Sequence, residues 1–269
     1  MHLQTPDASP YDLSFPLFGF SIRVTWTFWL VAALLGYTNA QSTDMLFAQT
    51  GRDTPGMAGL LVIWMAVMFV SILIHELGHT IAFRLFGVDS HIVLYHFGGM
   101  AIPESFTSFR GARNRRIGAA EQLVVSAAGP AAQLVLGSIV AGISIAFGYE
   151  PGLLLPMLRW IGIGIDLDLQ SPDNAAIYAL IGNLIYINFA WAILNLLPIL
   201  PMDGGRIAQS LIALAKKNDG LYEASVVSIV VGAVLGMWLW KFGNGSLGIM
   251  LIVLGLSNLE NIQRPGTRW

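Results

Sequence analysis

The chain has 269 residues, of which 55% are hydrophobic and 11% are charged, with a mean hydropathy of +0.66. This balance excludes an ordinary soluble globule, and the absence of cysteine excludes disulfides, thiolate metal ligands and thiol nucleophiles. The formal net charge is −2 and the sequence shows no basic face, so we expect no nucleic-acid partner. The composition instead favours an integral membrane protein embedded in a lipid bilayer.

Six apolar segments approach or exceed the roughly 20 residues that a helix needs to cross a bilayer. We expect an all-α polytopic membrane protein with about six transmembrane helices, near residues 17–38, 57–83, 118–148, 175–200, 222–241 and 245–260. The last segment is short and could be tilted or re-entrant instead. The N-terminal residues lack a basic n-region and a small-residue cleavage site, so we expect no cleaved signal peptide. No repeat or appended soluble domain interrupts the pattern, which predicts a single domain over 1–269 with its functional core at about 57–205.

Basic residues gather in alternate loops of this six-span arrangement. The N-terminal segment, the C-terminal segment and the loops 84–117 and 201–221 carry most of them: Arg23, Arg84, Arg110, Arg113, Arg115, Arg116, Arg206, Lys216, Lys217, Arg264 and Arg268. The opposite loops contain Arg52, Arg159 and Lys241, beside several acidic residues. Because basic loops stay on the cytoplasmic side, we expect both termini in the cytoplasm. The basic stretch 110–116 is expected to contact anionic lipid.

The second span contains the stretch ILIHELGHTIA at residues 72–82. On a helix, residues four positions apart project from one face, so His75 and His79 can hold a single ion, with Glu76 beside the first of them. Imidazole ligands favour zinc, and Glu76 could take a proton from water activated there. A short pattern can also arise by chance, with the histidines satisfying polar needs inside a helix bundle. An acid at a helix centre in the membrane costs about 2.5–3.5 kcal/mol, however, and a shared metal would offset that cost.

The segment from His91 to Met100 alternates β-branched and aromatic residues, which predicts a small β-hairpin or re-entrant loop after the second helix. Its Gly-Gly pair would permit a tight turn or close backbone approach. The alternative is an ordinary surface hairpin. His91 and His96 lie in this segment at no spacing typical of metal ligands, so we expect them to be structural or interfacial. An exposed strand edge can bind an extended peptide. We therefore expect this segment to bind the substrate, through Val93, Leu94, Tyr95, Gly98 and Gly99.

Residues 195–206, NLLPILPMDGGR, interrupt the fourth span. A helix cannot run through Pro198 and Pro201 without losing backbone hydrogen bonds, and the Gly-Gly pair that follows favours an irregular turn. Irregular backbone at membrane depth persists only where it is buried in protein or lines a polar cavity. We therefore expect the break to present Asp203 as a third ligand beside the two histidines, near the cytoplasmic end of the spans.

Taken in order, four motifs resemble the site-2 protease family of intramembrane zinc metalloproteases: HELGH, FGGM at 97–100, AAGP at 127–130 and NLLPILPMDGG at 195–205. The resemblance implies that His75, His79 and Asp203 bind one zinc ion per chain and that Glu76 is catalytic. Asn195 belongs to the last motif, and we expect it to orient the substrate or stabilise the developing oxyanion. The resemblance also implies a membrane-associated β-hairpin after the second helix.

The chain departs from the family pattern in two respects. Gln133 follows the AAGP motif where members often carry asparagine, and neither a PDZ-like insertion nor a cystathionine-β-synthase-type domain is recognised.

Together these features predict a zinc endopeptidase of a bacterial or archaeal cytoplasmic membrane that cleaves a transmembrane protein substrate near the cytoplasmic side. One alternative is a membrane zinc hydrolase acting on a cytoplasmic or lipid-linked substrate. Another is a non-catalytic zinc-binding relative, against which the presence of Glu76 argues. The sequence leaves the oligomeric state open.

Overall fold

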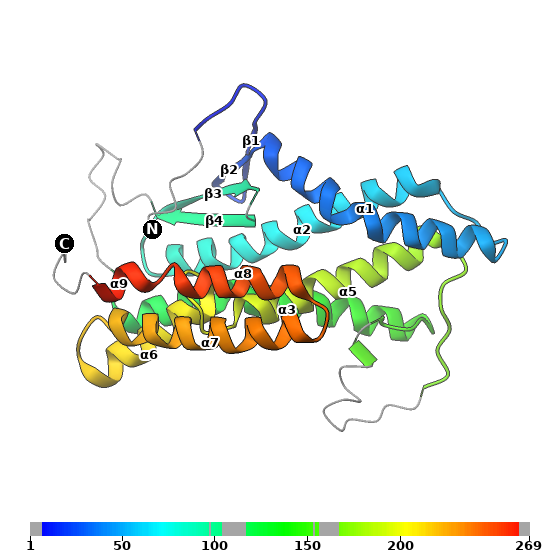
Figure 1. Ribbon diagram of the computed structural model, residues 1–269. Coiled ribbons are helices and arrows are strands. Elements are labelled where there is room, and N and C mark those ends of the chain that lie inside the picture. The colour runs from blue at the N-terminus through cyan, green and yellow to red at the C-terminus, as the bar shows by residue number, and fades with distance from the viewer. Residues whose placement is uncertain (1–6, 97, 104–116, 153, 156–166, 264–269) are drawn as a thin grey trace.

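The computed structural model describes residues 7–96, 98–103, 117–152, 154–155 and 167–263. Long helices lie side by side and alternate in direction (Figure 1), and shorter helices flank them at one end. The helices are α1 (Trp26–Gln49), α2 (Gly56–Leu85), α3 (Ala119–Ala146), α5 (Ala175–Asn195), α6 (Asp203–Lys216), α7 (Leu221–Lys241), α8 (Gly245–Leu256) and α9 (Leu259–Gln263).

Five helical segments in the described ranges are long and apolar enough to cross a membrane: α2, α3, α5, α7 and the continuous stretch Gly245–Gln263. The helix α1 is 24 residues long and packs along α2, but its second half is polar, with the sequence YTNAQSTD at residues 37–44. The polytopic helical fold is thus confirmed. The first expected span, 17–38, is wrong in position, because residues up to Val24 form strands and the helix runs to Gln49.

The small β-structure is larger than a single hairpin. Strands β1 (Leu13–Leu17), β2 (Phe20–Val24), β3 (Ser90–Tyr95) and β4 (Gly98–Pro103) form one sheet in the order β1-β2-β3-β4, with β2 and β3 parallel and the other pairs antiparallel. The N-terminal hairpin turns at Phe18 and Gly19, whose φ angles of 51° and 78° suit the tight turn of a two-residue loop. The alternation in β2, buried at Phe20, Ile22 and Val24, is the signal of a strand, but it lay inside an apolar run expected to be helical.

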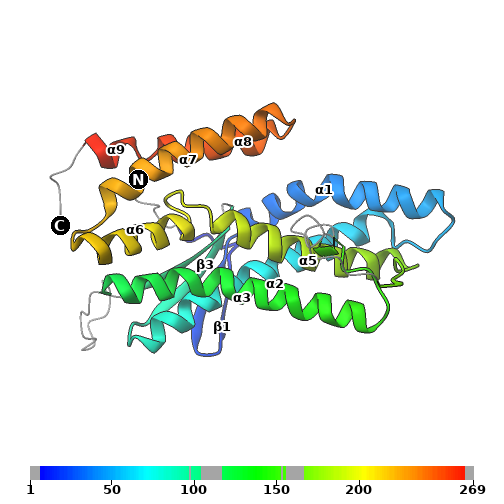
Figure 2. The same cartoon turned by 90° about the horizontal axis from the view of Figure 1, so that it is seen from below.

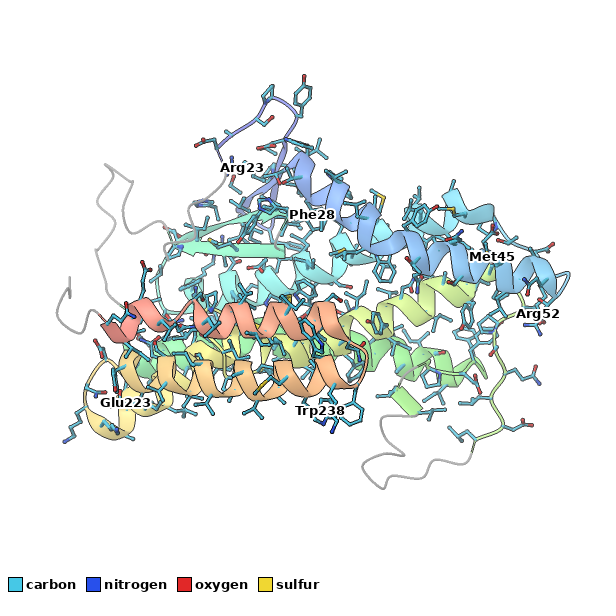
Figure 3. All side chains as sticks on the ribbon, in the orientation of Figure 1. Arg23, Phe28, Met45, Arg52, Glu223 and Trp238 are labelled. Atoms are coloured by element: carbon cyan, nitrogen blue, oxygen red, sulfur yellow. The ribbon has the colours of Figure 1, made fainter. Side chains whose placement is uncertain are left out.

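One face of this sheet is buried against the helices. Ile22 and Val24 from β2 join Ile92 and Leu94 from β3 in a core shared with α2, where Ile72, Leu73 and Leu77 belong to the same cluster. Phe28, at the start of α1, completes this packing and is labelled beside the sheet in Figure 3. The apolar contacts fix the sheet over the middle of α2, which brings β4 beside that helix.

The α7–α8 hairpin forms a layer of its own beside α6 (Figure 2). Its two helices cross closely because glycines face the neighbouring backbone: a Cβ at Gly232 would lie 2.6 Å from the Leu251 oxygen, and one at Gly236 would lie 2.6 Å from the Gly248 oxygen. Such close approach at small residues is typical of helix packing in membranes. The basic stretch 110–116 falls outside the described residues, as do residues 153 and 156–166 of the connection between α3 and α5.

Candidate metal centre

The helix α2 carries His75 and His79 one turn apart on the same face, as their spacing predicted. Their Nε2 atoms lie 3.0 Å from each other. The Asp203 Oδ2 atom lies 3.1 Å from His75 Nε2 and 3.3 Å from His79 Nε2. Both imidazoles are buried, and the Asp203 side chain is 13% exposed. Three donor atoms from two distant parts of the chain therefore converge on one point.

Asp203 reaches this point because the chain breaks between α5 and α6. The helix α5 ends at Asn195, residues 196–202 are irregular, and α6 begins at Asp203. The predicted interruption at the prolines is confirmed. Gly204 and Gly205 are helical, however, and do not form the irregular turn expected of them. Their lack of a side chain instead lets the first turn of α6 lie directly on the backbone of residues 196–200.

The outer nitrogens of both imidazoles are held by oxygen atoms. His79 Nδ1 donates to the Val125 carbonyl at 2.7 Å, because a carbonyl oxygen can only accept. His75 Nδ1 lies 2.9 Å from Gln133 Oε1, and the Gln133 amide nitrogen donates to the Ser71 carbonyl at 3.3 Å, which fixes the orientation of the amide. Both rings thus carry the proton on Nδ1 and present the Nε2 lone pair inward, the tautomer of a metal ligand. Gln133, which stands where family members often carry asparagine, thus orients the His75 imidazole.

These residues fit a zinc ion. Two imidazole lone pairs and one carboxylate face each other at 3.0–3.3 Å, an arrangement of acceptors that a cation stabilises. Ligand atoms about 2.0–2.1 Å from a tetrahedral zinc lie about 3.3 Å apart, close to the separations observed here. Two nitrogens and one oxygen are a donor set typical of catalytic zinc, in which a fourth position stays open.

A cavity of about 130 Å³ adjoins this centre and is lined by all three ligands and by Glu76. Glu76 is 4% exposed, and the backbone of Ala101 in β4 lies close enough to interact with its carboxylate. Gly99, also in β4, lies so close that an added Cβ would overlap the Glu76 side chain. The sheet therefore holds Glu76 from one side while the cavity leaves its carboxylate accessible to a small molecule such as water.

Residues 63–239 match the model of Peptidase family M50. The chain belongs to this family. This confirms the resemblance to site-2 proteases that the ordered motifs suggested.

The proteins similar to the chain include two curated proteins and one solved structure. A putative zinc metalloprotease from Synechocystis is 31% identical over 242 residues, which cover 88% of this chain and 52% of that protein. A zinc metalloprotease from Methanocaldococcus jannaschii is 26% identical over 191 residues, which cover 71% and 45% respectively. The chain therefore spans about half the length of the curated relatives it matches. The structure of a site-2 protease from M. jannaschii aligns over 94% of both chains with 21% identity and a TM-score of 0.44.

Asn195 lies at the end of α5 and lines the cavity, as expected of a residue that contacts substrate. Its catalytic role stays a prediction. His91 and His96 lie on or beside the hairpin outside the group of potential metal ligands, and His96 Nδ1 is 3.4 Å from the Thr27 hydroxyl. Their structural or interfacial role stays a prediction.

The strand β3 is internal to the sheet. It pairs with β2 on one side and β4 on the other, and Val93 and Leu94 are 2% and 0% exposed. The prediction that the main chain of Val93, Leu94 and Tyr95 forms an exposed edge is therefore wrong, because β2 of the N-terminal hairpin occupies that side. Tyr95 instead contributes its side chain to the cavity wall. The outer strand is β4, which contains Gly98 and Gly99 and has β3 as its sheet neighbour within the described residues.

Several cavity-lining residues were missed in the sequence. Gln122 and Ser126 precede Gly129 and Gln133 on α3 at spacings of four, three and four residues, so all four share one helix face. Trp191 stands one turn before Asn195 on α5 in the same way. The helical spacing of these polar and aromatic residues could have predicted that they line one site. The contribution of Met100 and Ala101 could not be predicted from the sequence, because it depends on how the sheet packs on α2.

The glycines of the HELGH and AAGP motifs allow α2 and α3 to touch at the metal centre. A Cβ at Gly78 would lie 2.5 Å from the Ala128 oxygen and 3.0 Å from the Gly129 Cα. A Cβ at Gly129 would overlap the His79 imidazole and lie 2.9 Å from His75 Nε2. Gly129 thus keeps clear the space in which the two ligand nitrogens meet.

We predict that Gly129→Ala weakens zinc binding by about tenfold or more, because the added methyl group occupies the space next to both Nε2 atoms. Gly142→Ala is the matched control, since it lies on the same helix and its added Cβ meets nothing within 4 Å. Zinc content and affinity of the purified proteins measure the effect. Equal zinc affinity in the two variants would contradict the assignment of Gly129.

Proposed function

We propose that the chain is an intramembrane zinc endopeptidase that cleaves a transmembrane segment of a membrane protein near the cytoplasmic side. The observation that carries the proposal is the meeting of two histidines, an aspartate and a glutamate at one cavity between apolar helices. His79 lies six residues before the end of α2, about 9 Å along the helix axis, so the site is below the end of its span. Membership of Peptidase family M50 supports the reading.

His75, His79 and Asp203 would hold the zinc ion, which supplies Lewis-acid chemistry that activates water and polarises a carbonyl. Glu76 accepts the proton of the attacking water and delivers it to the leaving amine. The Gly99 and Ala101 backbone keeps the Glu76 carboxylate in place during both transfers. Asn195, across the cavity, donates its amide to the substrate carbonyl.

A helical substrate shields its carbonyl groups, so it must unwind and bind as an extended chain. The outer edge of β4 offers main-chain groups for this purpose. The Leu94 carbonyl accepts from the Thr25 amide, so Leu94 faces β2 and its opposite residue Gly99 belongs to a pair without mutual hydrogen bonds. Gly99 therefore directs its backbone groups away from β3, and so does Ala101, two residues on, whose backbone also interacts with the Glu76 carboxylate. Such an edge can bind an added strand without demanding a particular sequence.

Glu76→Gln tests the function. This change keeps the size of the side chain but removes the proton acceptor, so cleavage of transmembrane peptides in vesicles should fall by several decades while zinc content stays at the wild-type level. Glu150→Gln, at an exposed position beyond α3, is the control and should cleave normally. Residual activity of Glu76→Gln close to wild type would overturn the role of Glu76. Cleavage of soluble or lipid-linked compounds alone would favour the alternative hydrolase.

The proposed strand pairing predicts a pattern in the substrate. Methylating one backbone nitrogen at a time in a cleaved transmembrane peptide should reduce its cleavage at every second residue beside the scissile bond, because alternate amides face β4. Methylation also removes helical hydrogen bonds, so a substrate that needs only to unwind should be cleaved faster at all positions. Cleavage rates of the methylated series distinguish the two outcomes, and the absence of an alternating pattern would exclude strand addition.

We further propose that both termini lie in the cytoplasm. The long helices alternate in direction (Figure 1), and Figure 3 shows Arg52 and Glu223 at opposite ends of the bundle. Reporters placed after residue 269 and within 106–116 should register as cytoplasmic, and those placed at 243 or within 166–173 as extracytoplasmic. Accessibility to a membrane-impermeant label provides the measurement. A reporter after residue 269 on the outside would contradict the arrangement at α8.

A further inference from the structure

The irregular segment between α5 and α6 is held by side chains from two other helices. At Leu200, the backbone nitrogen donates to the Ser228 hydroxyl of α7 at 2.9 Å. The Leu200 carbonyl accepts from the Asn258 amide, just after α8, also at 2.9 Å. Backbone outside a helix or sheet needs such partners when it is buried within the membrane. Both polar groups of this one residue are thereby satisfied from the α7–α8 hairpin.

These contacts are shielded from solvent. Leu200 is 8% exposed, Ser228 is 0% exposed and Asn258 is 3% exposed. The Ser228 hydroxyl donates to the Ala224 carbonyl at 2.7 Å, which leaves its oxygen to accept from Leu200. Asn258 also donates to the Leu254 carbonyl at 2.9 Å. Each side chain is therefore fixed to its own part of the hairpin while it binds Leu200.

The backbone of Leu200 also contacts the helix that carries the third metal ligand. A Cβ at Gly205, in the first turn of α6, would overlap the Leu200 nitrogen. The Met202 amide donates to the Ile199 carbonyl at 2.9 Å, which closes a turn immediately before Asp203. Since Leu200 is three residues from Asp203 and packed beneath its helical turn, a shift of Leu200 moves the Asp203 carboxylate.

We propose that Ser228 and Asn258 are positioning residues of the metal centre: they hold the Leu200 backbone so that Asp203 meets His75 and His79. The proposal deepens the proposed function and rests on it. Neither side chain is among the ligands, and within the described residues neither lines the cavity. The α7–α8 hairpin, a separate layer in Figure 2, therefore sets the geometry of a ligand that it does not contain.

The test compares Ser228→Ala and Asn258→Leu with Ser257→Ala. Ser257 is adjacent to Asn258, and its hydroxyl donates to the Leu254 carbonyl of α8, so the control removes a bond within the hairpin. We expect the first two variants to bind zinc about tenfold or more weakly, measured by competition with a chromogenic chelator, because groups that orient ligands have effects of this size. The control should bind zinc as the wild type does. Amide exchange over residues 196–202 in the metal-free protein should rise in the two variants and stay unchanged in the control.

A merely structural role would give a different result. The metal-free variants would then unfold at a lower temperature, while zinc affinity and exchange over 196–202 matched the wild type, and this result would overturn the proposal. Asn258→Gln retains the amide donor and should recover part of the lost affinity. Ser228→Ala keeps the assay decisive if Asn258→Leu does not fold. Because zinc affinity is measured without substrate, a wild type that binds zinc but cuts no transmembrane peptide would overturn the proposed function alone.

Discussion

The convergence of three electron-pair donors within an apolar helix bundle is the constraint on which this structure depends. Two imidazole nitrogens and a carboxylate oxygen lie within 3.3 Å of one another, where bulk water cannot solvate them. In a medium of low polarity, such groups are stable only with a shared cation and with firm partners on their outer side. The carbonyl of Val125 and the amide of Gln133 provide those partners, so α3 determines the ligand state of residues on α2.

The same constraint explains where side chains are missing. Gly129 leaves room for the imidazoles, Gly99 leaves room for the glutamate, and Gly205 leaves room for the irregular segment before α6. At each of these glycines, an added Cβ would lie less than 3.0 Å from an atom of another segment. An added carbon would meet backbone at Gly205 and a side chain of the site at Gly99 and Gly129, and these atoms would have to shift to accommodate it.

The break between α5 and α6 connects the centre to the rest of the bundle. It frees backbone groups that a continuous helix would pair, and the α7–α8 hairpin binds two of them at Leu200. The potential metal ligand Asp203 therefore begins a helix next to backbone that binds a later part of the chain. On the other side, β4 combines two tasks, since its backbone restrains Glu76 and its outer edge borders the cavity.

The sequence by itself determined the pattern of potential metal ligands: HELGH sets two histidines on one helix face, and Pro198 and Pro201 end a helix so that Asp203 can begin another. These features follow from local chain geometry, because helical periodicity and the missing amide of proline act over a few residues. Tertiary structure alone decided that β2 pairs with β3, which leaves β4 as the outer strand and overturned the predicted edge at Val93 and Leu94. It also decided that Gln133 binds His75 and that Ser228 and Asn258 bind Leu200. Those contacts join residues 28 to 58 positions apart, and no local pattern encodes them, since they depend on which helix faces meet when the apolar bundle packs.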